Sequence, residues 1–179
     1  MGSNMSEQVI VAVDPGSKES AFVVVAPATG GKVRLVRAAM VPGTCEAMAE
    51  FLDETINSHR LVQAVAIEWA VGFAYQPFRV PHLLAAQGVA GELSGLAYDR
   101  YIQVLRQTAP KWRAAVVGKL PRAVKIAGVK TPKPNYDALI ARALSSFFDG
   151  LESNYGNVHS RDAMGLAAWA SREVWKRVT

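Results

Sequence analysis

The pattern of apolar residues along the chain predicts five β-strands. Residues 9–13 are five consecutive apolar positions that end at Asp14, which is typical of a strand buried on both faces. Residues 21–26 form a second apolar run, and residues 32–38 alternate apolar with polar side chains, as in a strand with one solvated face. The remaining strands are expected at residues 64–68 and 101–105.

Five further segments are expected to be helical. Thr44 is the expected N-cap of the first, with Ala47 at its third position and Glu46 near the positive end of the helix dipole, and this helix ends near Ser58. The others are expected at residues 83–98, 111–117, 135–148 and 160–176. Short turns favour an antiparallel meander of the first three strands, and the β-α-β units that follow place strand four parallel to strand one. The predicted fold class is therefore α/β: a five-stranded mixed sheet, with a three-strand antiparallel meander and two parallel strands, flanked by helices.

The 179 residues of the chain are enough for one domain with a full core. Because no repeat, linker or low-complexity tract divides it, we expect a single domain at residues 8–179, preceded at residues 1–7 by an expression remnant and a disordered N-terminus. The single Cys45 excludes a disulfide within the chain and a cysteine-based zinc site, and fits a cytoplasmic protein. No apolar run approaches the length of a membrane span, so no membrane partner is expected.

Positive charge is concentrated in one part of the chain. The formal net charge is +5, and residues 100–136 contain nine Lys or Arg residues and no Asp or Glu. Such a run is often only a solvated face, but the length of this one, and the tryptophan, glycines and prolines within it, favour an exposed loop that lies along phosphates. The basic residues are Arg100, Arg106, Lys111, Arg113, Lys119, Arg122, Lys125, Lys130 and Lys133.

Three acids and a histidine fall where predicted elements end or begin. Asp14 ends strand one and Glu68 ends strand four, and these strands are expected to be parallel neighbours. Asp162 is expected in the first turn of the last helix, and His159 precedes it by three residues, which places both on one helix face. Taken singly, each has an ordinary explanation: a turn for Asp14, an arginine partner for Glu68, the helix dipole for Asp162, and a capping or core role for His159.

Taken together, these four residues favour a metal site if the last helix packs over the same sheet edge. Clustered carboxylates raise one another's pKa unless a divalent cation is bound, and hard oxygen ligands suit Mg²⁺ or Mn²⁺. Two such ions about 4 Å apart activate a water and stabilise the leaving oxygen in phosphodiester hydrolysis. No GxGxxG follows the first strand and no GxxxxGK(S/T) occurs, so neither a dinucleotide site nor a phosphate-binding NTPase loop is expected, and no organic cofactor.

The order of these motifs matches a known family. The matching segments are residues 11–17, 66–68 and 159–167, with weaker matches at residues 86–90 and 116–118. Through them, over residues 8–176, the chain resembles the RuvC family of Holliday-junction resolvases, which has the RNase H-like fold. The resemblance implies a dimeric endonuclease that uses Mg²⁺ or Mn²⁺ to nick two strands symmetrically across a four-way DNA junction.

The resemblance also implies roles for individual residues. Asp14, Glu68 and Asp162 would be ligands of two Mg²⁺ or Mn²⁺ ions, and His159 either a ligand of the second ion, which would favour Mn²⁺, or a general base. An aromatic residue shortly after the strand-four acid would insert at the junction's exchange point; the candidates are Trp69 and Phe73, with a hydrophobic plug over the sheet edge as the alternative. The residues expected to hold DNA phosphates are Lys111, Arg113, Lys119, Arg122 and Lys125.

Several alternatives stay open from the sequence. The helix at residues 83–98 matches the family's dimer helix, or packs its glycines against the sheet of its own chain. Residues 119–133 look longer than in the cellular enzymes, which is similar to phage-encoded relatives. The other activities considered are a less selective branched-DNA or flap nuclease, a RuvX-type nuclease of ribosomal RNA precursors, and a non-enzymatic module that bridges DNA arms, against which the three intact acids argue.

Overall fold

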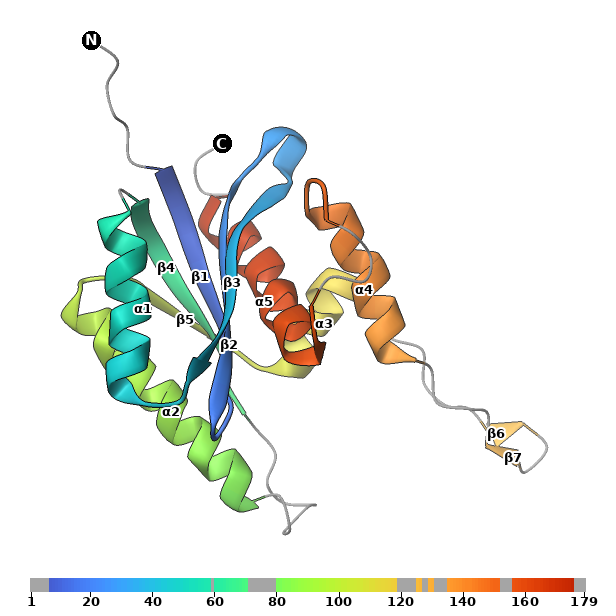
Figure 1. Cartoon of the computed structure of the whole chain (residues 1–179). Helices are drawn as coiled ribbons and strands as arrows, with labels where there is room; N and C mark the ends of the chain where they lie inside the picture. Colours follow the sequence, from blue (N-terminus) through green and yellow to red (C-terminus); the bar gives the residue numbers. More distant parts are fainter. Residues whose placement is uncertain are drawn as a thin grey trace.

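A five-stranded mixed sheet forms the centre of the molecule (Figure 1). The computed structural model describes residues 7–58, 60–70, 80–118, 125–126, 129–130, 135–151 and 156–175. The strands are β1 Glu7–Asp14, β2 Glu19–Pro27, β3 Val33–Pro42, β4 Arg60–Glu68 and β5 Gln103–Gln107. They lie in the order β3-β2-β1-β4-β5; β1, β2 and β3 pair antiparallel, and β4 and β5 run parallel to β1. The predicted fold class is confirmed.

Within the described residues, five α-helices and a small hairpin accompany the sheet. They are α1 Cys45–Asn57, α2 Val80–Asp99, α3 Ala109–Val117, α4 Tyr136–Phe147 and α5 Val158–Trp175, with a 3-10 helix η1 at Thr29–Gly31 and hairpin strands β6 Lys125–Ile126 and β7 Val129–Lys130. The Thr44 hydroxyl caps α1 by accepting a hydrogen bond from the Ala47 N–H, as predicted. The hairpin was not predicted, because two residues per strand carry no periodic pattern. None of the helices in the described ranges has the length and apolar character needed to cross a membrane.

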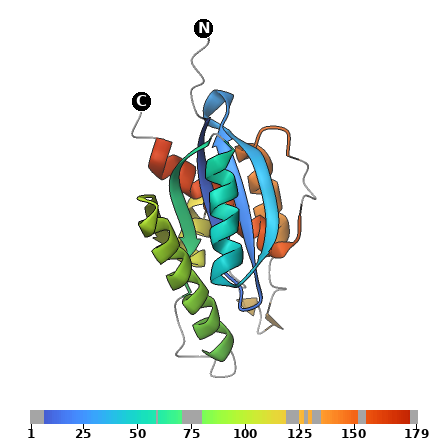
Figure 2. The same cartoon turned by 60° about the vertical axis from the view of Figure 1, so that its left-hand side comes forward.

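The helices cover the two faces of the sheet in two layers (Figure 1, Figure 2). α1 and α2 pack on one face, and α3, α4 and α5 pack on the other. Val9, Val11 and Val13 of β1 lie in the core on the α1–α2 side, whereas Ile10 and Ala12 lie in the core on the α5 side, and all five are fully buried. This alternation confirms a strand buried on both faces, and it places the next side chain, that of residue 14, on the α5 side.

Some element boundaries differ from the predicted ones. β5 begins two residues later than expected, because Tyr101 has a φ of 56° and takes part in ending α2. The Tyr101 N–H donates to the Tyr98 carbonyl, and the Ile102 N–H donates to the Ala97 carbonyl. β3 continues past its predicted end at residue 38, because it pairs along the whole length of β2.

The turn after β1 depends on Gly16. Its N–H donates to the Ser20 hydroxyl at 3.3 Å, and the neighbouring Gly43 N–H donates to the Lys18 carbonyl at 2.8 Å. A Cβ added to Gly16 would lie 2.1 Å from the Glu19 carbonyl oxygen, so no larger residue fits without moving the backbone. The turn therefore fixes the end of β1 against the start of β2.

Gly16→Ala is expected to lower the free energy of unfolding by about 1–3 kcal/mol, because the backbone must move to admit the methyl group. Urea unfolding measures this loss. Gly43→Ala is the matched control, since its added Cβ would come no closer than 3.4 Å to its neighbours, and it should unfold near the wild type. Equal unfolding midpoints for the two variants would contradict the requirement for glycine at position 16.

Candidate active site

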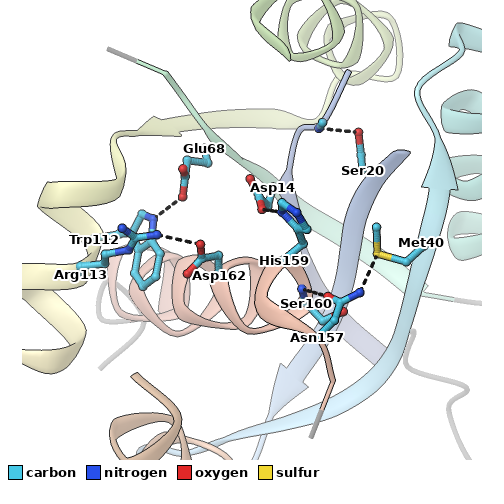
Figure 3. Close-up of polar contacts among 11 residues, drawn as sticks. Asp14, Ser20, Met40, Glu68, Trp112, Arg113, Asn157, His159, Ser160 and Asp162 are labelled. Atoms are coloured by element: carbon cyan, nitrogen blue, oxygen red, sulfur yellow. Dashed lines mark hydrogen bonds and ion pairs between the residues drawn. The ribbon is translucent and has the colours of Figure 1, made fainter. Parts of the chain in front are cut away.

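Asp14 and Glu68 end two neighbouring parallel strands on the same side of the sheet. In the pairing of β1 with β4, Val13 lies opposite Ile67, so the two acids follow at the same level. Ala66 lies in the core on the α5 side, and the alternation of side chains along β4 puts Glu68 on that side as well. Both carboxylates lie at this sheet edge (Figure 3).

α5 brings His159 and Asp162 to the same edge. The helix begins two residues before its predicted start, because the Asn157 side chain caps it by accepting a hydrogen bond from the Ser160 N–H at 2.8 Å. Asp162 therefore lies in the second turn, and its predicted place in the first turn is wrong. The predicted proximity to strand one does hold, since His159 Nδ1 lies 2.8 Å from Asp14 Oδ2.

α3 also contributes to this edge, through Trp112 and Arg113 (Figure 3). The indole N–H of Trp112, which is fully buried, donates to Glu68 Oε2 at 2.7 Å. Arg113 Nη2 donates to Asp162 Oδ2 at 2.7 Å, and its guanidinium carbon lies 5.1 Å from the centre of the Trp112 ring. Sequence reasoning missed both contacts. The only signal for Trp112 was a large apolar ring within an otherwise basic segment, which indicates that one side of the helix is buried.

The three carboxylates share one electrostatic environment. Burial raises the pKa of Glu68 to about 7, and the negative charges of Asp14 and Asp162 add to this rise, while Trp112 and Arg113 oppose it. Burial also raises the pKa of Asp14. The pKa of Asp162 is raised, first by burial and then by the charge of Asp14, against the opposing effect of Arg113. The acids are therefore close enough to repel one another.

The residue types at this edge suit a hard divalent cation, since three carboxylates and one imidazole are present. In their present orientation they do not form a finished ligand set: across the described residues, no three His, Cys, Asp or Glu side chains are grouped so as to hold a metal ion. The reason is that each carboxylate faces a partner of its own, which is His159 for Asp14, Trp112 for Glu68 and Arg113 for Asp162. A cation shared by the acids would compete with these partners, above all with Arg113 for Asp162.

A cavity of about 160 Å³ opens beside Asp14 and Glu68. It is also lined by Pro15, Ala70, Leu83 and Ala86. The Gln87 side-chain amide of α2 donates to the Ala70 carbonyl at 2.7 Å, and this bond ties α2 to the segment directly after Glu68. A larger hollow of about 410 Å³ lies at the far end of β2, between Pro27 and Trp175, away from the acids.

The predicted DNA-binding residues occupy different places. Trp69 is half-buried against the core on the α1–α2 side, and the guanidinium carbon of Arg106 lies 4.8 Å from the centre of its ring. Lys111 is exposed on α3, whereas Arg113 is engaged with Asp162. Phe73, Lys119 and Arg122 lie outside the described residues, and only the backbone of Lys125 is described. Their DNA contacts stay predictions.

Comparison with solved structures identifies the fold. The chain is similar to Thermus thermophilus RuvC, with a TM-score of 0.69 and 18% identity over 95% of this chain and 96% of that chain. It is similar to T. thermophilus RuvC in complex with a Holliday junction substrate, with a TM-score of 0.66 and 20% identity over 95% of each chain. The fowlpox virus Holliday junction resolvase gives a TM-score of 0.54 and 16% identity over 92% of this chain and 99% of that chain. No protein-family model and no curated protein sequence matches. The chain therefore has the RNase H-like fold of RuvC, as predicted.

The stability of the metal-free protein should fall as the pH rises from about 4.5 to about 7. In this window the folded protein binds more protons than the unfolded chain, because folding raises the pKa of Glu68, Asp14 and Asp162. Each such group contributes a slope of up to about 1.4 kcal/mol per pH unit. Urea unfolding in EDTA across this range measures the effect, and Glu68→Gln should flatten it. A stability that increases with pH in this window would contradict the shared burial of the acids.

Proposed function

We propose that this chain is a divalent-metal-dependent endonuclease that resolves four-way DNA junctions by paired symmetric nicks, with residues 8–179 as its nuclease domain. The observation that carries the proposal is the convergence of Asp14, Glu68 and Asp162, from β1, β4 and α5, at one edge of a RuvC-like sheet. Three partly buried acids with raised pKa values destabilise the fold when they are charged, and a bound cation would offset that cost. Such an enzyme acts in DNA recombination and repair.

Asp14, Glu68, Asp162 and His159 would hold two Mg²⁺ or Mn²⁺ ions. When bound, such ions supply an activated water and stabilise the leaving oxygen of a phosphodiester. His159 is either a ligand of the second ion or a general base, and its contact with Asp14 fits both roles. Arg113 neutralises Asp162 in the present arrangement. If Asp162 turns toward a bound ion, the Arg113 guanidinium would remain beside the site, where its N–H groups could donate to a phosphate oxygen.

The DNA would lie along α3 and the basic segment that follows it. Lys111 is exposed on α3, the same helix whose Trp112 and Arg113 contact the acids. The nine basic residues and absent acids of residues 100–136 give this region the charge that a phosphate backbone requires. The phosphate ligands would be Lys111, Arg113, Lys119, Arg122 and Lys125, and Trp69 or Phe73 would meet the exchange point. The similarity to T. thermophilus RuvC in complex with a Holliday junction substrate supports branched DNA as the partner.

A homodimer would supply the two symmetric nicks, and α2 offers the surface for it. One exposed face of α2 carries three glycines between two large apolar side chains, in the order Leu84, Gly88, Gly91, Gly95 and Tyr98. A Cβ added at any of the three glycines would meet nothing within 4 Å in the described part of the chain, so no described segment packs on these glycines. The face is nearly symmetric about Gly91, and two antiparallel copies of α2 would bring Leu84 near Tyr98 of the second copy.

Asp14→Asn is expected to leave binding of a synthetic four-way junction unchanged and to reduce Mn²⁺-dependent cutting by about 100-fold or more, because the amide removes a charged metal ligand and no DNA contact. Gel shift and cleavage assays on the same DNA measure the two effects. Glu50→Gln, at an exposed position of α1, is the matched control and should cut normally. Retained cutting by Asp14→Asn would contradict the metal role.

Junction, flap and RNA substrates of equal length separate the proposed activity from its alternatives. Two symmetric nicks in the junction, with weak cutting of the others, support a resolvase. Equal cutting of flaps would indicate a less selective nuclease, and preferred cutting of RNA would indicate a nuclease of ribosomal RNA precursors. Tight binding without metal-dependent cutting of any substrate would indicate a module that only bridges DNA arms.

Gly91→Glu is expected to convert the dimer into monomers, because two carboxylates would meet at the centre of the α2 surface. Size-exclusion chromatography with light scattering measures the mass. Ser145→Glu, at an exposed position of α4 on the opposite face of the sheet, is the control and should stay dimeric. A monomeric wild type would contradict the dimer, and a dimer that survives Gly91→Glu would contradict the choice of α2.

A further inference from the structure

The side chain of Trp112 packs between α3 and α5, and its one polar side-chain atom lies at the sheet edge where Asp14 and Glu68 end their strands. Its side chain is fully buried, and its ring lies against Gly165 of α5, where an added Cβ would come within 2.2 Å of Cζ3 and 2.7 Å of Cη2. The indole N–H donates to Glu68 Oε2 at 2.7 Å, across 44 residues of sequence. Only a residue without a side chain at position 165 leaves room for the ring to reach Glu68.

This arrangement can fix the orientation of the Glu68 carboxylate. The side chain of Glu68 has three rotatable bonds and lies at the end of β4. The backbone therefore fixes its Cα but not its carboxylate. Trp112 has two rotatable bonds, and close packing on Gly165 restricts both, so its single donor has a fixed direction. One carboxylate oxygen of Glu68 accepts from this donor, and no side chain of the described residues donates a hydrogen bond to the other, which a ligand could therefore use. Partners of this kind orient metal ligands in many proteins.

We propose that Trp112 is a positioning residue of the nuclease site, which fixes the Glu68 carboxylate through its indole N–H and depends on Gly165 for its place. This inference rests on the proposed function, because the orientation of Glu68 matters only if Glu68 binds the ion. It assigns to α3 a task apart from DNA binding. It also gives Gly165, which is one turn beyond Asp162 on α5, a role in the same site.

Trp112→Phe tests the proposal, because it keeps an aromatic ring between α3 and α5 and removes the N–H donor together with the outer part of the indole; the Trp175→Phe control removes the same atoms elsewhere. Calorimetric titration of Mn²⁺ should show affinity about 10-fold or more weaker than in the wild type. Junction cutting should slow at saturating DNA, whereas junction affinity in EDTA should be unchanged. Trp175→Phe is the matched control: Trp175 also donates its indole N–H to a side-chain oxygen, Gln63 Oε1 at 2.7 Å, but lies away from the acids.

The outcomes separate the two proposals. Equal Mn²⁺ affinities in Trp112→Phe and Trp175→Phe would overturn the positioning role while leaving the nuclease intact. A wild type that binds no Mn²⁺ and cuts no junction would instead overturn the proposed function. A loss of thermal stability in Trp112→Phe with no change in Mn²⁺ affinity or cutting rate would show a purely structural ring and would also overturn the positioning role.

Two further measurements apply if Trp112→Phe fails to fold. In nuclear magnetic resonance spectra of the metal-free protein, Glu68→Gln should shift the indole N–H signal of Trp112 and not that of Trp175; an unmoved Trp112 signal would overturn the contact. Gly165→Ala should displace the ring and reproduce the weaker Mn²⁺ binding. Wild-type Mn²⁺ affinity in a folded Gly165→Ala protein would overturn the dependence on Gly165.

Discussion

The gathering of three partly buried carboxylates at one edge of the sheet is the constraint on which the rest of this structure depends. Asp14, Glu68 and Asp162 come from three elements; the charges of Asp14 and Asp162 raise the pKa of Glu68, and the charge of Asp14 also raises the pKa of Asp162. A fold that only needed stability would place apolar residues at this edge, as it does one residue earlier in β1 and β4. The acids therefore fit the proposed site, in which a bound cation would neutralise their charge.

The surrounding helices provide a specific hydrogen-bond partner for each of the three carboxylates. α3 supplies an indole donor to Glu68 and a guanidinium to Asp162, and α5 supplies an imidazole to Asp14. On the other face of the sheet, the Gln87 amide ties α2 to the segment after Glu68. The helix with the exposed glycine face is thus joined to the segment that follows Glu68, so a hydrogen bond links the proposed dimer surface to the candidate site.

The parts that could be predicted from the sequence follow local rules. Alternation along a strand and the β-α-β connection brought Asp14 and Glu68 together, and helical spacing put His159 and Asp162 on one face. The Trp112 and Arg113 contacts could not be predicted, because they depend on how α3 packs against α5. Gly165, which makes that packing possible, has no local signature, and the left-handed Tyr101 shifts β5 in a way that no propensity indicates.

Anomalous scattering from Mn²⁺-soaked crystals shows whether the acids of β1, β4 and α5 share bound cations. Anomalous peaks are expected among Asp14, Glu68 and Asp162, with Asp162 rotated away from Arg113. Saturating Mn²⁺ that gives peaks only elsewhere, with Arg113 still bonded to Asp162, would contradict a shared cation site.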